Sequence, residues 1–483
     1  MSRTIVGPFN RVEGDLEVQI EIDQGAVKEA WVVSPMYRGF EQILHGKDPR
    51  DALIYTPRIC GICSVSQSIA SAEALAHAVG VVRPRNGELA LNLIHACENL
   101  ADHFTHFYLF FMPDFAREIY RSEPWFEAVA QRFKAVKGRA AGDVMQARAE
   151  FMHLMGIMAG KWPHTLGIQP GGSTRGIEAK EKVRLLTILG GFRRFLEQRL
   201  FGAPLEQVLE IGNQQQLDTW LASGDPAESD FRRLLQLSND LQLDQLGKTA
   251  NRFMSYGVYP LEGERTFRSG VWYQGKRKKL NSERITEDIS HSWMEGQNEP
   301  QHPYHGVTLP NADVDAGYTW CKAPRLDGEV VEVGALARQL IDGQSLINDL
   351  VSAGGSNVRN RMIARLLEIP RVLIEMEQWV RLLKPKEPFC SDSGVKRDSE
   401  GYGLTEAARG SLGHWVRIKN GRILNYQIIA PTTWNFSPRD QNGVSGPLEQ
   451  ALIGAPVREG EKEPVAVQHI VRSFDPCMVC TVH

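Results

Sequence analysis

The feature that most constrains this chain is a Cys-x-x-Cys pair near each end. Cys60 and Cys63 lie in RICGIC, and Cys477 and Cys480 lie in DPCMVCTVH at the end of the 483-residue sequence. Each pair can present two thiolates to one metal ion, and the glycine between Cys60 and Cys63 permits a tight turn. If the two pairs meet, residues 1–483 form a single unit whose termini come together at a metal site.

Four thiolates are compatible with more than one kind of site. A structural zinc site with four cysteine ligands is the plainest, but the pairs of a zinc ribbon usually lie within about 15–20 residues of each other. A disulfide redox pair does not explain two such pairs at opposite ends. A buried reactive centre is the third interpretation, because thiolates also suit nickel, copper(I) and iron. The remaining cysteines are scattered and are expected in the core: Cys97, Cys321 and Cys390.

Composition excludes several classes of partner. The net charge is −3, with 42% apolar and 23% charged residues, so no bulk electrostatic force favours nucleic acid or an anionic membrane. The longest apolar run, residues 107–113, is far too short to cross a bilayer, and we expect no membrane span. Seven cysteines is a low, odd number, and residues 1–25 lack a secretory signal pattern. These features favour the reducing cytoplasm.

Periodicity predicts a mainly α fold with small β elements (α+β). Apolar residues at helical spacing predict long helices over 86–111, 143–159, 177–200 and 356–384. Alternation around Asp-Gln-Gly predicts a β-hairpin at 15–33, and Asn420-Gly421 marks the turn of a second hairpin at 415–428. Residues 203–335 are expected to be mixed, with short strands and turns. The β elements therefore lie toward both ends of the chain.

Motifs along the whole chain carry a resemblance to a known family. They are RVEG (11–14), YRGFE (37–41), RICGIC (58–63), DHFTHFY (102–108), PHTLGIQPGG (163–172), ARGSLGHW (408–415), PTTWN (431–435) and DPCMVCTVH (475–483). In this order they resemble the large subunit of [NiFe] hydrogenases. The resemblance implies a central helical bundle and a Ni-Fe(CO)(CN)2 centre that cleaves H2 heterolytically.

The family pattern implies roles for the residues that would surround this centre. Cys60 and Cys477 match terminal ligands of nickel, and Cys63 and Cys480 match ligands that bridge nickel to iron. Four neighbouring positions match as well: Arg409 overhangs the metals, Thr432 hydrogen-bonds a cyanide, and Asp102 and Asp475 are acidic residues near the site.

The resemblance also implies a proton path and a second metal. Glu13 in RVEG matches a relay glutamate that would take a proton from Cys477. Glu41 and His483 match ligands of Mg²⁺ or another hard divalent cation, together with a backbone carbonyl near Ile428.

Electrons from H2 need a carrier on another chain. The sequence has neither a Gly-x-Gly-x-x-Gly motif after a strand nor a ferredoxin-like cysteine run, and three cysteines cannot hold a cluster by four thiolates. An iron–sulfur small subunit is therefore the expected partner, forming a heterodimer that can pair further into a dimer of heterodimers.

Three positions favour the regulatory, H2-sensing branch of the family. Gln67 replaces a usual histidine, and Ile62 and Phe110 are bulkier than the usual Val and Leu at the inner end of the gas path. The sequence also ends at His483, without the short extension of most precursors. We therefore expect a low-turnover sensor that signals to a histidine kinase. Two alternatives stay open: a catabolic uptake hydrogenase large subunit in mature form, and a structural zinc protein with four cysteine ligands.

Overall fold

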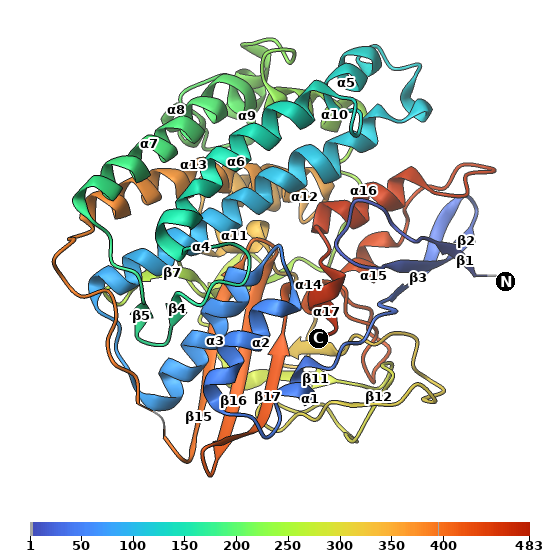
Figure 1. Ribbon diagram of the computed structural model, residues 1–483. Helices are drawn as coiled ribbons and strands as arrows, with labels where there is room; N and C mark the ends of the chain where they lie inside the picture. Colours follow the sequence, from blue (N-terminus) through green and yellow to red (C-terminus); the bar gives the residue numbers. More distant parts are fainter. Residues whose placement is uncertain (1–2, 395) are drawn as a thin grey trace.

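Four long helices form the centre of the protein, which we describe from a computed structural model covering residues 3–394 and 396–483 (Figure 1). They are α4 (Arg85–Thr105), α6 (Arg139–Ala159), α7 (Ala179–Phe195) and α13 (Val358–Leu382). Helix α4 packs against α6 and α13, and α7 packs against the same two helices. The predicted helices and the mainly helical α+β class are confirmed.

Two predicted helices end differently from the expectation. After Thr105 the chain widens into a π-helical turn, His106–Phe111, and then tightens into a 3-10 turn over Met112–Ala116. Pro113 in that turn has no amide N–H to continue an α-helical ladder. Helix α7 likewise passes into a π-helical turn at Leu196–Phe201. The apolar pattern continues through both turns, so periodicity alone extends the predicted helices too far.

Shorter helices cover the bundle and carry the chain between its parts. They are α1 (Phe40–Leu44), α2 (Ala52–Tyr55), α3 (Ser64–Val79), α5 (Phe126–Phe133), α8 (Leu205–Leu209), α9 (Gln214–Ala222), α10 (Asp230–Asp240), α11 (Ala335–Asp342), α12 (Ser345–Gly354), α14 (Pro431–Asn435), α15 (Pro447–Leu452), α16 (Val465–Phe474) and α17 (Met478–Thr481). Three of them, α8 to α10, lie in the region expected to hold short strands and turns, so its first third is more helical than predicted.

Both predicted hairpins are present, each within a three-stranded antiparallel sheet. The first sheet has β1 (Thr4–Val6), β2 (Glu17–Asp23) and β3 (Ala26–Val33) in that order. The second has β15 (Ser399–Ala407), β16 (Gly410–Lys419) and β17 (Arg422–Ile429), of which β15 was not predicted. Asn420 and Gly421 turn between β16 and β17 with φ of 52° and 72°. This left-handed pair matches the right-handed twist of the flanking strands.

The remaining strands are short and antiparallel. They are β4 (Ile168–Gln169), β5 (Gly172–Ser173), β6 (Arg252–Ser255), β7 (Val258–Leu261), β8 (Glu264–Phe267), β9 (Gly270–Tyr273), β10 (Lys276–Lys278), β11 (Ile285–Asp288), β12 (Met294–Glu295), β13 (Leu309–Pro310) and β14 (Ala323–Leu326). Most of them fall between 252 and 326, where mixed structure was expected.

Two glycines of β15 allow helix α3 to lie directly on the second sheet. A Cβ on Gly403 would come 1.9 Å from the Ala70 carbonyl oxygen, and one on Gly401 would come 2.2 Å from the Ala74 oxygen. Any larger residue would therefore push the helix away from the sheet. Because α3 begins at the residue after Cys63, this close packing fixes the position of the first cysteine pair.

The C-terminal residues lie between the bundle and the second sheet, against the segment that follows β1, whereas the N-terminus itself is at the edge of the molecule (Figure 1). Glu13 forms a parallel β-bridge with Cys477, and the Met478 amide donates to the Glu13 carbonyl at 2.7 Å. Farther along, the Val27 amide donates to the Ala455 carbonyl at 2.9 Å. These backbone contacts hold the last residues against the N-terminal segment.

Candidate metal centre

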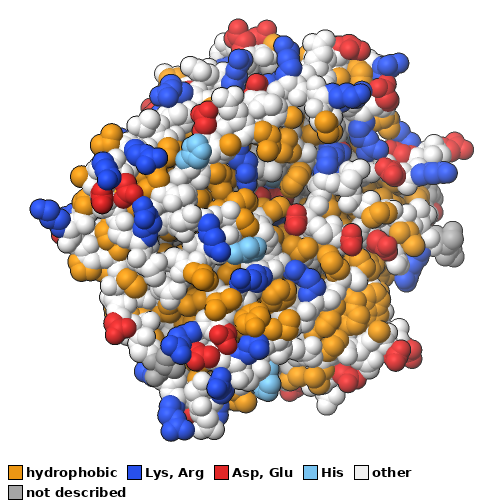
Figure 2. All heavy atoms as spheres, in the orientation of Figure 1, with side chains coloured by type: hydrophobic (Ala, Val, Ile, Leu, Met, Phe, Trp, Pro, Cys, Tyr) orange, Lys and Arg blue, Asp and Glu red, His pale blue; other side chains and the backbone are white. Residues whose placement is uncertain are grey.

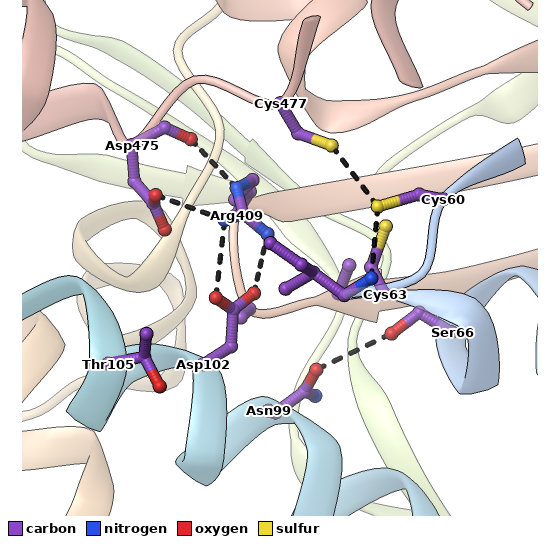
Figure 3. Close-up of polar contacts among 12 residues, drawn as sticks. Cys60, Cys63, Ser66, Asn99, Asp102, Thr105, Arg409, Asp475 and Cys477 are labelled. Carbon is purple, nitrogen blue, oxygen red and sulfur yellow. Dashed lines mark hydrogen bonds and ion pairs between the residues drawn. The ribbon is translucent and has the colours of Figure 1, made fainter. Parts of the chain in front are cut away.

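Four buried sulfur atoms from opposite ends of the chain meet at one point. Cys60 follows a 3-10 turn, Cys63 precedes α3, and Cys477 and Cys480 lie at the start and in the middle of the short helix α17. Sγ–Sγ distances are 3.5 Å for Cys60–Cys477, 3.1 Å for Cys63–Cys480 and 3.1 Å for Cys477–Cys480. All four donors lie within 4.8 Å of one another. Figure 3 shows Cys60, Cys63 and Cys477 pointing toward a common point.

The geometry and charge of this cluster suit a metal group. All four thiols are free, and their separations exceed the roughly 2.05 Å of a disulfide. Hydrogen bonding from Cys477 places the pKa of Cys60 well below its usual value, whereas burial raises the pKa of Cys477 and of Cys480. Several thiolates in one buried space repel one another unless a cation holds them. The donor set therefore fits soft transition metals.

Arg409 is buried beside the cluster and contacts two carboxylates (Figure 3). It lies in the tight connection between β15 and β16, where its Nη2 contacts Asp102 at 3.2 Å and Asp475 at 3.1 Å. Its Nε also donates to the Asp475 carbonyl at 2.9 Å. Burial alone would lower the pKa of Arg409, but Asp102 and Asp475 raise it well above its usual value. The guanidinium is therefore a fixed positive charge.

The two acidic partners of Arg409 differ in their electrostatics. Burial raises the pKa of Asp102 to about 7 despite the nearby guanidinium. Burial would also raise that of Asp475, yet Arg409 and other cationic groups lower it below its ordinary value. Arg365 of α13 adds to this by contacting Asp475 at 3.2 Å. Asp475 therefore stays ionised, whereas the pKa of Asp102 lies close to neutral pH.

Thr432 and Ile62 contact the cysteine pairs through the backbone. The Thr432 hydroxyl oxygen accepts a hydrogen bond from the Cys477 amide at 3.1 Å, which leaves its own proton free to donate. The Ile62 amide donates to the Cys60 sulfur at 3.3 Å, and its side chain is half-buried. Thr432 and Ile62 thus lie next to Cys477 and Cys60, the two cysteines that are expected to bind nickel terminally.

Glu13 is half-buried beside the second cysteine pair. Its amide and carbonyl bind the backbone on either side of Cys477, at the Pro476 oxygen and the Met478 amide. Burial, and then the neighbouring Cys60, raise the pKa of its carboxyl above the usual value. A carboxyl with a raised pKa next to thiolates can accept and release a proton more readily near neutral pH.

Glu41 and His483 meet in a second, oxygen-rich cavity of about 20 Å³. His483 Nε2 lies 3.3 Å from Glu41 Oε1, and the Ile428 amide donates to the same oxygen at 2.7 Å. Lys322 lies 3.4 Å from Glu41 and 3.6 Å from Glu287. Burial would raise the pKa of Glu41, but Lys322 and His483 lower it to about 2. Ile428 thus contacts Glu41 through its amide, and a carbonyl ligand near Ile428 stays a prediction.

This second cavity fits a hard cation. Glu287 Oε2 is buried, and the described residues offer it no hydrogen-bond partner. Oxygen donors from Glu41 and Glu287, with the imidazole of His483, match the preferences of Mg²⁺ and similar ions. The ammonium group of Lys322 already supplies one positive charge there.

Comparison with known proteins identifies the family. The sequence profile described as nickel-dependent hydrogenase matches residues 38–120 and 234–483. The chain belongs to the nickel-dependent hydrogenase family. Its relatives include the periplasmic [NiFeSe] hydrogenase large subunit of Desulfomicrobium baculatum, 30% identical over 99% of this chain and 94% of the relative. The uptake hydrogenase large subunit of Rhodobacter capsulatus is 28% identical over 100% and 95%, respectively.

Solved structures agree over the full length. The [NiFeSe] hydrogenase of Dm. baculatum superposes with a TM-score of 0.87 at 28% identity, covering 100% of both chains. The enzyme of D. vulgaris Hildenborough gives 0.85 at 29% identity, with the same coverage. This chain is accordingly the large, catalytic subunit of a nickel–iron hydrogenase, and its four-cysteine cluster is the nickel–iron site. The zinc-protein alternative is therefore wrong.

The residues expected along the gas path have distinct surroundings in this hydrogenase subunit. Gln67 is buried in the first turn of α3, and its Nε2 lies 3.8 Å from the Cys480 sulfur. Phe110 is half-buried in the π-helical turn after α4, where its carbonyl accepts from Arg11 at 3.0 Å. Gln67 therefore contacts Cys480 directly, one of the two cysteines that are expected to bridge nickel and iron.

A buried carboxylate that sequence analysis missed binds the backbone that follows the first cysteine pair. Glu98 of α4 accepts from the amides of Val65 and Ser66 at 2.8 Å each, and from Trp162 Nε1 at 2.9 Å. It thereby caps the N-terminus of α3 directly after Cys63. The sequence around it mixes apolar residues with His95, Asn99 and Asp102, so Glu98 carried no distinct signal.

One cysteine expected in the core lies at the surface. Cys97 and Cys321 are buried as predicted, but Cys390 is exposed. It sits in the extended segment after α13, where its backbone bridges to Gly172 and its side chain faces outward. Such a segment pairs through the backbone and leaves its outer side chains in water.

No helix among the described residues combines the length and apolar character needed to cross a membrane.

Proposed function

We propose that this chain is the catalytic subunit of an H2-sensing [NiFe] hydrogenase and acts as one unit over 1–483. The observation that carries the metal assignment is the meeting of four buried sulfurs within 4.8 Å. Cys60 and Cys477 would hold nickel terminally, and Cys63 and Cys480 would bridge it to an iron with CO and cyanide ligands. When bound, this group supplies an electron-rich metal pair at which H2 is polarised and split.

The chain's own residues then orient charge and carry protons. Arg409, fixed by Asp102 and Asp475, presents a positive charge beside the four sulfurs. The free hydroxyl proton of Thr432 can donate to a cyanide. Glu13 is the proposed proton acceptor, supported by its raised pKa and its backbone bridge to Cys477. We expect Glu13→Gln to retain its metals but to lose H/D exchange, since an amide cannot take up the proton.

We further propose a divalent cation, Mg²⁺ for preference, at Glu41 and His483. The support is the set of hard donors described above, including a buried Glu287 oxygen that accepts no hydrogen bond from the described residues and lies 3.6 Å from the Lys322 ammonium. A backbone carbonyl near Ile428 would complete the protein ligands. Such an ion would tie the last residue of the chain to the segment that carries Glu41.

Two electrons per H2 must leave through a partner, which we propose is an iron–sulfur small subunit. Figure 2 shows apolar side chains gathered on one face, over the region where Figure 1 places α1, β11 and the C-terminus. Large apolar side chains remain exposed on neighbouring elements, including Ile43 of α1 and Leu309 of β13. A face of this kind suits a permanent partner chain. Assembly into a dimer of heterodimers and a cytoplasmic location belong to the same proposal.

The test of the metal assignment is elemental analysis joined to infrared spectroscopy of the purified heterodimer. We expect about one nickel per chain and absorption bands of metal-bound CO and cyanide. Zinc in place of nickel, or the absence of these bands, would refute the assignment.

The sensor role rests on Ile62, Phe110 and Gln67. Bulky side chains narrow a gas path, which hinders O2 more than the smaller H2. The Ile62 amide bonds to the Cys60 sulfur, which supports a position for this side chain beside the nickel ligands. Slow turnover with transfer of the signal to a histidine kinase is the proposed output. The names of the uptake-type relatives favour the alternative, a catabolic uptake enzyme.

Oxygen sensitivity separates the two roles. We expect the chain to oxidise H2 slowly in air, and Ile62→Val with Phe110→Leu to become inactivated by O2. The measurement is H2 oxidation with and without O2 in both proteins. Fast turnover that O2 abolishes in the unmodified enzyme would favour uptake, and an O2-tolerant double variant would remove the gas-path argument.

A further inference from the structure

Three polar side chains form a buried row that leads to the Cys480 sulfur. Gln67 Nε2 lies 3.8 Å from Cys480 Sγ, and its Oε1 lies 2.8 Å from His414 Nε2. His414, on β16, places its Nδ1 2.8 Å from the hydroxyl of Tyr426 on β17. Gln67, His414 and Tyr426 are each at most 1% exposed. Water therefore does not compete for these hydrogen bonds.

The protonation states in this row restrict the direction of its hydrogen bonds. The two ring nitrogens of His414 meet the Tyr426 hydroxyl and the Gln67 amide, which are both uncharged, and the ring is buried. An imidazolium would lack a compensating charge there, so the imidazole is neutral and carries a single N–H. One ring nitrogen must donate and the other must accept.

Only one of the two tautomers ends with a donor on the sulfur. If the proton sat on Nδ1, Nε2 would accept from the Gln67 amide, and the Gln67 carbonyl would face Cys480. Oxygen lone pairs would then meet a thiolate. With the proton on Nε2, Tyr426 donates to His414, His414 donates to Gln67, and Gln67 donates to Cys480. Each bond in such a chain polarises the next.

We propose that His414 is a positioning residue that, oriented by Tyr426, holds the Gln67 amide with its N–H toward the Cys480 sulfur. The inference rests on the proposed function, because a metal is what keeps Cys480 as a thiolate. The N–H withdraws electron density from this bridging-type ligand. An amide does not titrate, so Gln67 donates this hydrogen bond but does not transfer its proton. Proton transfer is therefore left to Glu13.

The infrared CO band of the metal-loaded heterodimer reports this hydrogen bond. Losing the N–H···S bond makes the sulfur and the iron more electron-rich, which moves the CO band to lower wavenumber. We expect this downshift in Gln67→Leu, His414→Leu and Tyr426→Phe. His414→Gln retains one acceptor and one donor and should keep the band at its original position.

A matched control and a second measurement make the test decisive. Tyr402→Phe removes a hydroxyl on the adjacent strand β15, where the Tyr402 ring lies 4.3 Å from that of His77, and should leave the band in place. Should a variant fail to load metal, the unmodified protein labelled with ¹⁵N in glutamine side chains gives the answer. Electron spin-echo spectroscopy of its nickel should detect one glutamine nitrogen.

The outcomes separate this inference from the proposed function. A normal CO band that does not move in His414→Leu and Tyr426→Phe would overturn the positioning role, as would the absence of a glutamine nitrogen coupling. Absence of nickel and CO bands from the unmodified protein would instead overturn the proposed function, and this inference with it.

Discussion

The sulfur cluster and the oxygen-rich cavity are built from the same two ends of the chain, but their negative charge is compensated in different ways. The cluster joins Cys60 to Cys477, and the cavity joins Glu41 to His483. In the cavity, the ammonium of Lys322 lies 3.4 Å from Glu41. Beside the cluster, Arg409 is already paired with two carboxylates, and the Arg38 guanidinium donates to the backbone carbonyls of Ile59 and Val479. The cluster must therefore take its positive charge from outside, whereas the cavity can fold with its own.

The largest expected effect is the loss of nickel when one sulfur is removed. Cys63→Ser replaces a soft thiolate by a hydroxyl that stays protonated, so the site loses both charge and softness. We expect no nickel in the purified variant by elemental analysis. Cys390→Ser, at an exposed cysteine, is the matched control and should bind nickel normally. Full nickel content in Cys63→Ser would contradict the claim that the sulfur cluster, unlike the oxygen-rich cavity, depends on a bound metal for its positive charge.

The next effect concerns Arg409, the arginine beside the cluster. Arg409→Lys keeps the charge but loses the planar fork that contacts Asp102 and Asp475 together. A misplaced charge should lower H2 oxidation by about 10²-fold with the metals retained. The measurement is the H2 oxidation rate per bound nickel. An unchanged rate would mean that charge alone, and not its direction, matters at this position.

In the cavity, Lys322→Met should destabilise the metal-free protein. It leaves Glu41 and Glu287 buried without their cation, a loss of about 3–5 kcal/mol in the free energy of unfolding. Added Mg²⁺ should restore more stability to this variant than to the unmodified protein. Urea unfolding with and without Mg²⁺ measures both. Lys384→Met breaks an exposed pair with Glu387 and should cost no more than about 1 kcal/mol.

The smallest effect is on acid stability. The pKa of Glu41 lies near 2 in the folded chain, below its usual value of 4.5. Its ionisation therefore stabilises the fold above about pH 4.5, and this contribution disappears as the pH falls toward 2. Glu41→Gln should remove about 2 kcal/mol of that dependence between pH 6 and pH 3 in the metal-free protein. Urea midpoints from pH 6 to pH 3 test this, with the exposed Glu400→Gln as control.

Local pattern predicted the elements of this fold better than their packing. Two hairpins and four long helices followed from alternation, helical spacing and the Asn420-Gly421 turn. The docking of α3 on β15 did not, because it depends on Gly401 and Gly403, more than 300 positions away in the chain. Two isolated glycines in a sequence do not indicate which backbone will approach them.

The two regions also differ in what the sequence could indicate. Cys60, Cys63 and their C-terminal partners carry a spacing that itself signals a metal. Lys322, by contrast, lies in a loop with no motif, and its role appears only when Glu41 and Glu287 surround it. The same holds for His414, whose partner Gln67 is remote in sequence. Charge compensation in a buried cavity is a property of the folded chain, and no local pattern encodes it.

The most direct test of the account is anomalous X-ray scattering from a crystal of the heterodimer, measured at the nickel, iron and zinc absorption edges. The account predicts one nickel peak and one adjacent iron peak among the sulfurs of Cys60, Cys63, Cys477 and Cys480. A single zinc peak at that point, or four sulfurs without any metal peak in an H2-oxidising preparation, would contradict it.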